Sequence, residues 1–455
     1  ISSRLILTLH AVLIATMALQ FYWNVLDFQY MISFPLHIGT FFVVALMCHS
    51  ELAATRPDAD RLTEFYLCMS IGGALGGLFN AIIAPRIFVS YVEYPLVLAL
   101  SCLARRPAYP FGWRSGTRFA ALIAFLSLLS IALIYHYSDN WTPVWMDFRV
   151  PLVLAVACLL SLTLVGQPRF MALAYAAIFF FGAHIWNREY LFIGRNVFGT
   201  LQVERFSNGV DYLTHGNILH GAELMTEKRP HEPLTYYHHN SPIGHIFEAY
   251  DDQFANAKIS LVGLGAGTMA AYAKPGQDWT FYEINPMIER VARDPNLFTY
   301  LTDCKATNRI VMGDGRQSIE QAPDGASALM AFDAFSSDAI PTHMLTREAI
   351  QLYLRKLAPH GILAFNISTR CVELRPTLRE LARDANLACL YEISGGSNEE
   401  ATQHKSASTW FVMARSKEDL DRLRSSKYNF SLLDANPPAS LWTDDFSNLI
   451  ETLRF

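Results

Sequence analysis

The chain has 455 residues, of which 52% are hydrophobic and only 17% are charged, and its mean hydropathy is +0.19. Soluble globular proteins carry about 25% charged residues, so this composition excludes a fully soluble enzyme, a fibrous protein and a disordered chain. The formal net charge of −5 argues against a general nucleic-acid binder.

The charged residues are distributed unevenly along the chain. Residues 1–190 contain 11 arginines but no lysine, and the first lysine is Lys228. The low average charge therefore comes from the N-terminal part, whereas residues 191–455 have an ordinary soluble composition. We expect two regions in different solvents, with a boundary near residue 190.

Residues 1–188 are predicted to form a helical transmembrane domain with about seven spans. A helix needs about 20 predominantly apolar residues to cross a bilayer. The fourth apolar run contains Pro95, which predicts a kink. The segment 71–77 reads IGGALGG, whose small residues either allow close helix contact or simply make a thin helix. The expected spans lie near 5–23, 30–49, 63–84, 88–103, 119–137, 150–166 and 170–186.

Two arginine-containing loops, 50–62 and 104–118, bear on the orientation of these spans. The positive-inside rule places both loops in the cytoplasm. Seven spans would then place the C-terminal region on the opposite side of the membrane. One miscounted span reverses this result, so the arginines alone leave the side of the C-terminal region open.

The pattern after residue 190 changes to short strands and then to alternating strands and helices. Residues 196–225 alternate apolar and polar positions with glycines between them, which predicts short antiparallel strands. From residue 257 onward the alternation predicts a parallel sheet with helices on both faces. The expected strands are 258–265, 279–285, 309–315, 327–335, 361–368 and 408–415, and the expected helices are 267–273, 286–293, 346–358 and 375–387.

Four consecutive predicted strands end in residues that commonly bind ligands. Glycines let the backbone approach a ligand, an acid on the second strand can accept hydrogen bonds from ribose hydroxyls, and the next acid suits an adenine edge. Because ligands bind beyond the carboxyl ends of such strands, the set predicts a nucleoside site. It fits S-adenosylmethionine as well as NAD, and the lack of a third glycine in GxGxxG register favours the former. In chain order these residues are Gly263, Gly265, Gly267, Glu283, Asp314 and Asp333.

These motifs resemble those of the spermidine synthases (aminopropyltransferases), and most closely those of bacterial proteins that fuse such a domain to a membrane region. The resemblance covers about 195–450. It implies a small β-strand cap domain at 195–252, followed by a Rossmann-like domain of class I methyltransferase type at 253–455. The segments that carry it are LTHGNILHG at 213–221, PLTYYHHNSPIG at 233–244, LVGLGAG at 261–267, FYEINP at 281–286, MGDGR at 312–316, DAFSSDAIPTHMLTREA at 333–349 and WTDDFSN at 442–448.

The resemblance also implies how the co-substrate is bound. A sulfonium nucleoside, either S-adenosylmethionine or its decarboxylated form, would lie on the glycine loop. Glu283 would hold the ribose and Asp314 the adenine.

Four further residues are implied at the reacting amine. Asp333 and Asp338 would lie beside it, and Tyr237 with His238 resembles the Tyr-His of the family's substrate gate. A sulfonium is already a good leaving group, so the enzyme has to align the amine and keep it deprotonated. Asp333 is the expected base.

The sequence departs from the family at three places that would handle a cationic amine. Ala266 stands where the glycine loop of soluble spermidine synthases usually carries an acid. Histidines stand at the other two places. We expect them to face the substrate, while structural roles stay open, and metal ligation has no spacing to support it. The seven cysteines form no CxxC pair either, so no metal site is expected. The departing histidines are His215 and His220 at one place and His239 at the other, and His238 of the retained Tyr-His completes the group of four.

We therefore expect a membrane-anchored transferase that moves an alkyl group, of aminopropyl type, from the nucleoside to a small amine. Two alternatives stay open: an S-adenosylmethionine-dependent methyltransferase, and a catalytically inactive accessory subunit of a membrane complex. We expect contact with a lipid bilayer, no nucleic acid, and assembly as a homodimer or within a membrane complex. Because S-adenosylmethionine is an intracellular metabolite, we expect an integral protein of the bacterial inner membrane with its C-terminal region in the cytoplasm.

Overall fold

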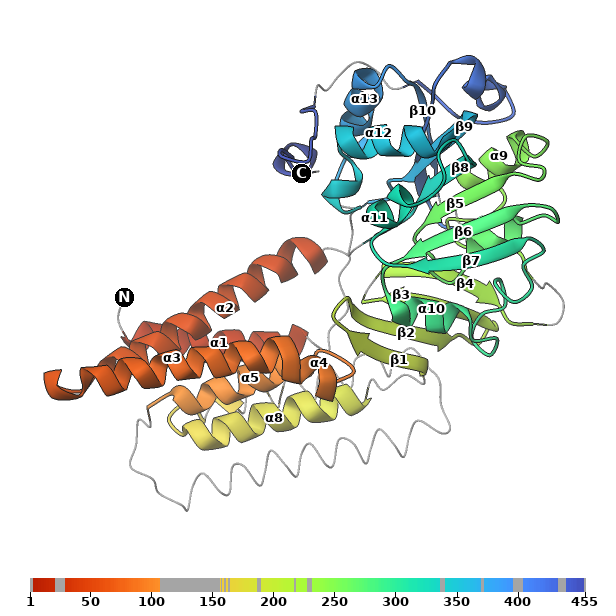
Figure 1. Cartoon of the computed structure of the whole chain (residues 1–455). Coiled ribbons are helices and arrows are strands. Elements are labelled where there is room, and N and C mark those ends of the chain that lie inside the picture. The colour runs from red at the N-terminus through yellow and green to blue at the C-terminus, as the bar shows by residue number, and fades with distance from the viewer. Residues whose placement is uncertain are drawn as a thin grey trace. The chain divides into compact units, whose positions relative to one another are not determined.

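The chain forms two compact units, Ile1–Arg188 and Glu189–Phe455 (Figure 1). The structure is a computed structural model. It describes residues 3–20, 29–106, 156, 158, 161, 162, 164–185, 190–216, 218–226, 231–335, 340–369, 372–395, 404–432 and 439–453.

All regular elements among the described residues of the first unit are helices, joined by short turns. Two stretches, Ile32–Ala54 and Ala59–Ile87, are long and apolar enough to cross a membrane, and shorter apolar helices cover Arg4–Gln20, Glu93–Ala104 and Pro168–Phe179. The spans predicted at 119–137 and over most of 150–166 lie outside the described residues, so a bundle of about seven spans stays a prediction. The helices are α1 (Ser3–Gln20), α2 (Gln29–Ala54), η1 (Ala59–Arg61), α3 (Leu62–Leu78), the π-helical η2 (Phe79–Ile83), α4 (Ala84–Ile87), α5 (Glu93–Ser101), η3 (Cys102–Ala104) and α8 (Pro168–Ile185).

The kink predicted at Pro95 is wrong. Pro95 lies in the first turn of α5, where backbone N–H groups have no partner within the helix and a proline is tolerated. The proline inside a helix is instead Pro35, in α2. The glycines of 71–77 lie on α3, and an added Cβ at Gly72 or Gly76 would meet no atom within 4 Å. The described residues therefore show no close contact at this segment.

The second unit begins with a four-stranded antiparallel sheet, as the sequence predicted. Its strands follow chain order and pair with their neighbours, and Leu201, Val203 and Leu213 point into its buried side. This alternation of buried and exposed residues is typical of a sheet with one covered face. The strands are β1 (Tyr190–Asn196), β2 (Gly199–Arg205), β3 (Val210–His215) and β4 (Ile218–Leu224).

A seven-stranded sheet follows, in the order β10-β11-β9-β8-β5-β6-β7 (Figure 1). Strands β5 to β9 are parallel, and β11 runs antiparallel to both of its neighbours. The carboxyl ends of the parallel strands therefore meet at one edge. The strands are β5 (Lys258–Val262), β6 (Asp278–Glu283), β7 (Thr307–Met312), β8 (Ser327–Phe332), β9 (Leu357–Asn366), β10 (Ala388–Ser394) and β11 (Ser408–Ala414).

Both faces of this sheet are buried under helices. Successive side chains of a strand point to opposite faces: Leu261 belongs to one buried cluster and Val262 to the other. Helices α9 (Pro242–Ala249) and α10 (Pro286–Ala292) supply the first cluster, and the second is completed by α11 (Gly315–Glu320), α12 (Arg347–Lys356) and α13 (Arg375–Asp384). The predicted arrangement of a parallel sheet covered on both sides is confirmed.

Several predicted elements need correction. The helix expected at 267–273 is a single 3-10 segment, η4 (Thr268–Tyr272), and Pro275 restricts helix at Lys274, so the segment cannot extend past the turn that follows. Strand β9 begins at Leu357 rather than 361. Strand β10 and the short helices α9 and α11 were not predicted. Helix α12 is capped at its N-terminus by Thr346, whose side chain accepts a hydrogen bond from the Ala349 N–H at 3.2 Å.

Candidate functional site

The glycine loop that follows β5 lies against two backbone carbonyls. A Cβ on Gly263, whose φ is +98°, would lie 2.2 Å from the Asp333 carbonyl oxygen. A Cβ on Gly265, whose φ is +53°, would lie 2.4 Å from the carbonyl oxygen of His220. Only glycine fits these positions, so the loop is held close to both β8 and β4. Gly267 also has a positive φ and precedes η4.

Glu283 ends β6 beside this loop and is almost fully buried. Its Oε2 accepts a hydrogen bond from the Leu264 N–H at 3.0 Å, and its Oε1 accepts one from the Asn285 N–H at 2.8 Å. Burial raises the pKa of this carboxyl, and the backbone hydrogen bonds oppose that shift. The carboxylate is thereby fixed next to the loop, with lone pairs left for a ligand.

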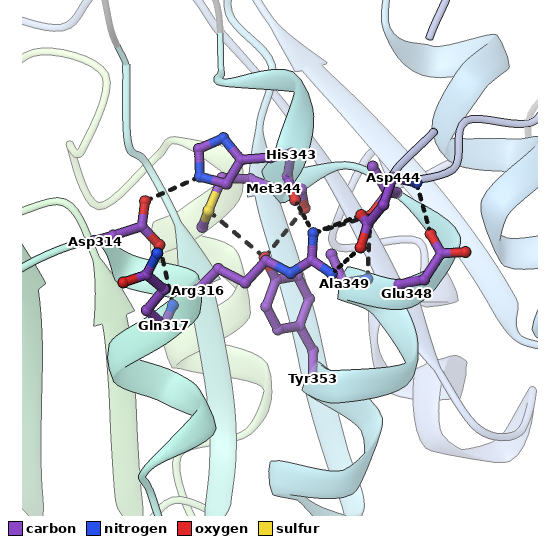
Figure 2. A network of polar contacts seen from close by, with 10 residues as sticks. Asp314, Arg316, Gln317, His343, Met344, Glu348, Ala349, Tyr353 and Asp444 are labelled. Atoms are coloured by element: carbon purple, nitrogen blue, oxygen red, sulfur yellow. Dashed lines mark hydrogen bonds and ion pairs between the residues drawn. The ribbon is translucent and has the colours of Figure 1, made fainter. Parts of the chain in front are cut away.

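Asp314 caps the N-terminus of α11 beyond the end of β7. Its Oδ1 accepts a hydrogen bond from the Gln317 N–H at 3.0 Å, and its Oδ2 lies 3.0 Å from Nε2 of His343 (Figure 2). Figure 2 also shows Arg316 reaching away from Asp314 to Asp444, with two contacts of 2.6 and 2.7 Å. The acid predicted to bind adenine is therefore already paired with a histidine.

Asp333 follows β8 and is partly buried at the centre of the strand ends. The Tyr237 hydroxyl donates a hydrogen bond to its Oδ2, and the Asn366 amide donates one to its Oδ1 at 2.8 Å. Burial raises the pKa of Asp333 to about 6, although both hydrogen bonds act to lower it. Burial and the charge of Asp333 raise the pKa of Tyr237 well above its usual value, so Tyr237 stays a donor.

Two cavities meet at Asp333. The first runs along the strand ends past Gly263, Glu283 and Asp314, with a volume of about 200 Å³. The second, of about 520 Å³, lies between β4 and the ends of β9, β10 and β11. Three residues line both cavities: His220, Asp333 and Phe335. A group bound in one cavity can therefore reach a group bound in the other only past this partition.

The four histidines separate into two pairs. His215 and His220 line the first cavity, with ring centroids 5.6 Å apart, and burial followed by the His215 charge lowers the pKa of His220 to about 4. His238 is buried, and its Nδ1 accepts a hydrogen bond from the Asn240 N–H at 3.1 Å. His239 packs edge-on against Tyr272 and lines a different cavity.

The structure thus brings together most of the predicted site. Gly263, Gly265, Glu283, Asp314 and Asp333 share the first cavity, and Tyr237 contacts Asp333. His238 and His239 do not line either of the two cavities that meet at Asp333. Asp338 lies outside the described residues. Within the described part of the chain, no group of three potential ligands could hold a metal ion.

Three residues of the site were missed by the sequence reasoning. Asn366 ends β9, and the strand-end rule that selected Asp333 would have found it. His343 contacts Asp314 and lies in the segment DAIPTHML, which carried the family resemblance. Phe198, at the turn between β1 and β2, lines the first cavity, and no local signal in the sequence marks it.

Of three comparisons with known proteins, only the one with solved structures finds similar proteins. No protein-family model matches the chain, and no curated protein matches it. A probable spermidine synthase from Corynebacterium glutamicum is similar at 16% identity and a TM-score of 0.42, covering 58% of this chain and 98% of that chain. Spermidine synthase from Thermotoga maritima is similar at 11% identity and a TM-score of 0.36, covering 58% of this chain and 84% of that chain. An S-adenosylmethionine-dependent methyltransferase from Archaeoglobus fulgidus is similar at 12% identity and a TM-score of 0.27, covering 38% of this chain and 92% of that chain.

Proposed function

We propose that the second unit binds S-adenosylmethionine or its decarboxylated form in the first cavity. There it would transfer an alkyl group, of aminopropyl type, to an amine held in the second cavity. The observation that carries this proposal is the position of Asp333, a carboxylate with a raised pKa of about 6 at the junction of the two cavities.

Glu283 and Asp314 support the binding half of the proposal. Both carboxylates lie at strand ends on the first cavity. Backbone N–H groups donate hydrogen bonds to both oxygens of Glu283 and to Oδ1 of Asp314, which fixes their orientation. A ribose can donate its two hydroxyls to Glu283, and an adenine amino group can donate to Asp314 in place of His343. The glycine loop lets the sulfonium portion approach the backbone.

Asp333 supports the chemical half. The neutral amine attacks the carbon bonded to the sulfonium, so a C–N bond forms, the C–S bond breaks and its electron pair remains on sulfur. The new ammonium gives its extra proton to Asp333, which is mostly ionised near pH 7 because its pKa is about 6. Tyr237 and Asn366 fix the orientation of this carboxylate.

Binding and product analysis on the purified full chain test the proposal. We expect calorimetry to show binding of at least one of the two nucleosides. Incubation with an amine panel should then release the thioether nucleoside. Methylthioadenosine indicates transfer of the alkyl chain, which is aminopropyl when the decarboxylated nucleoside is the donor, whereas S-adenosylhomocysteine indicates methyl transfer. If neither nucleoside binds, the proposal is wrong and an accessory role without catalysis is favoured.

We also propose that the first unit anchors the enzyme in a bilayer and that the second unit faces the cytoplasm. The two long apolar helical stretches and the intracellular source of the nucleoside support this arrangement. Protease added to sealed right-side-out vesicles should leave residues 190–455 intact. Cleavage there from outside, without detergent, would contradict the proposed orientation.

A further inference from the structure

We propose that the second cavity selects an acceptor that carries one amine and one hydroxyl group, an amino alcohol, rather than a diamine. This inference rests on the proposed function, because it assumes that the acceptor amine lies at Asp333. It concerns the residues of the second cavity that contact the end of the acceptor that does not react.

The charges around the second cavity favour a neutral far end. Among the lining residues that the structure describes, Asp333 is the only carboxylate, and it is assigned to the reacting amine. His220 is neutral near pH 7, since its pKa is about 4. Against the lining that the structure describes, a second ammonium would be buried among neutral groups, which is far more costly than burying a hydroxyl that finds a hydrogen bond.

The far wall of the cavity consists largely of hydroxyl side chains from β10, β11 and the segment after β9. Several of these hydroxyls are already engaged: Ser368 donates to Asn366 Oδ1 and accepts from the Thr409 N–H at 2.9 Å. The hydroxyl-bearing residues on this wall are Ser368, Thr369, Ser394, Ser406, Ser408 and Thr409.

Two buried polar atoms on this cavity lack a hydrogen-bond partner among the described residues, His220 Nε2 and Ser408 Oγ. His220 is 8% exposed and Ser408 is 3% exposed. Buried polar groups are normally hydrogen-bonded, so such atoms indicate a missing partner. A hydroxyl can donate to one group and accept from another, whereas an ammonium can only donate.

The positions of Asp333 and Ser408 fit the two ends of one acceptor. Asn366, which holds Asp333, pairs with Trp410 on β11, and Ser408 lies two residues before Trp410. Two residues of an antiparallel strand span roughly 7 Å. An amine at Asp333 thus leaves its other end near Ser408, while His220 lies in the partition beside the reacting atoms.

Three acceptors of matched length test the inference: 4-amino-1-butanol, 1,4-diaminobutane and 1-aminobutane. Their dissociation constants are measured by calorimetry on the full chain saturated with the thioether nucleoside, and kcat/KM is measured alongside. We expect the amino alcohol to bind and react at least tenfold better than either of the others. A wild-type preference for the diamine, or equal use of all three, overturns the inference.

Substitutions at Ser408 assign the discrimination to this cavity. Ser408→Ala should reduce the preference for the amino alcohol over 1-aminobutane to within about threefold. Ser408→Asp should shift the preference toward the diamine. Ser425→Ala, an exposed serine in the same unit, serves as the matched control and should leave the ranking unchanged. An unaltered ranking in both Ser408 variants counts against the inference.

The two proposals fail in different ways. If neither nucleoside binds, the proposed function fails, and this inference fails with it. If a nucleoside binds but the diamine is the preferred acceptor, only the inference about the acceptor is overturned.

Discussion

Helix α3 and the seven-stranded sheet are both rich in apolar residues, but they present those residues in opposite ways. No residue of α3 is buried, and Leu67, Ile71 and Leu75 are 58%, 49% and 59% exposed. In the sheet, Phe332 and Phe365 are fully buried and stack with ring centroids 4.6 Å apart. A contiguous apolar surface of the first kind marks contact with a membrane or a protein.

The difference shows why average composition was a poor guide to function. The hydrophobic residues of the second unit are buried on both faces of a sheet. This packing fixes the strand ends and the functional groups placed there. Those of α3 remain available to the surroundings. The first unit should therefore respond to changes of polarity at its surface, and the second to changes of volume in its core and of charge at its strand ends.

The largest effect is expected at the strand ends. Asp333→Asn keeps the size of the side chain but removes the base, so kcat should fall by about 10²- to 10⁴-fold. The affinity for the nucleoside should change by less than about threefold, because Glu283 and Asp314 are assigned to its binding. Single-turnover kinetics and calorimetry separate the two quantities. Full activity in this variant would show that Asp333 is not the base.

Core packing of the sheet comes next. Phe365→Ala removes a fully buried ring stacked on Phe332 and should cost about 3–5 kcal/mol of stability. The matched change Leu75→Ala on α3 should leave the unfolding transition of the second unit unchanged. The transition is followed by intrinsic fluorescence of the purified full chain during urea unfolding. Equal shifts in the two variants would contradict the contrast between the regions.

Charge on α3 tests the opposite side of the comparison. Ile71→Arg places a charge near the middle of the apolar stretch Ala59–Ile87, and an arginine at the centre of a spanning helix costs about 2.5–3.5 kcal/mol. The fraction of protein that resists alkaline extraction from membranes should fall sharply. Leu432→Arg is the matched control, because Leu432 is 67% exposed in the second unit and the same charge there should have no effect. An extracted fraction equal to that of the unsubstituted chain would contradict the expectation that α3 is needed for membrane attachment beside Ile32–Ala54.

The raised pKa of Asp333 predicts a pH dependence. Below about pH 6 the base is protonated, so kcat measured at saturating acceptor should fall about tenfold per pH unit below that value. Asn366→Ala removes a hydrogen bond that lowers the pKa of Asp333, so the fall in rate on the acid side of the pH profile should begin at a higher pH. If the rate of this variant falls at the same pH as that of the unsubstituted chain, Asn366 does not affect the pKa of Asp333.

The same carboxyl has the opposite effect on stability. Its folded-state pKa lies above the usual value of about 3.9, so the folded chain holds an extra proton between about pH 3.9 and 6. The contribution of this group to stability therefore decreases as the pH rises through that window. Activity and the stability contribution of Asp333 are thus expected to change in opposite directions.

The strand ends could be predicted from sequence because the information is local. A buried run followed by Gly263, Glu283, Asp314 or Asp333 fixes both the strand and the group at its end, whatever the rest of the chain does. Neighbouring parallel strands then bring these groups to one edge. The cap strands were predictable for the same reason, from their period of two.

The histidines show where this local reasoning stops. His220 and His238 both belong to motifs of the cap region, yet only His220 lines the two cavities that meet at Asp333. The turn before His238 contains Thr235 with a φ of +62°, a conformation that a threonine rarely adopts and no sequence rule predicts. The second cavity was also beyond reach, because β10 and β11 come from the distant C-terminal part of the chain.

The smallest effect is expected where the second unit holds charges at its surface. Asp444 forms two contacts with Arg316 (Figure 2) and also accepts a hydrogen bond from the Thr346 hydroxyl at 2.7 Å. Asp444 is exposed, and surface ion pairs contribute about 0–1 kcal/mol, so Asp444→Asn should cost no more than about 1 kcal/mol. Urea unfolding of the full chain measures this change.

An exposed pair elsewhere gives the control for Asp444. Lys427→Gln breaks the contact with Glu248, in which both side chains are more than half exposed, and should have almost no effect on stability. Nucleoside affinity should stay within about threefold in both variants, since Arg316 points away from Asp314. A tenfold loss of affinity in Asp444→Asn would instead show that the C-terminal segment positions the N-terminus of α11. In that case a surface charge of the second unit would affect nucleoside binding, contrary to the expectation that only its core and its strand ends do.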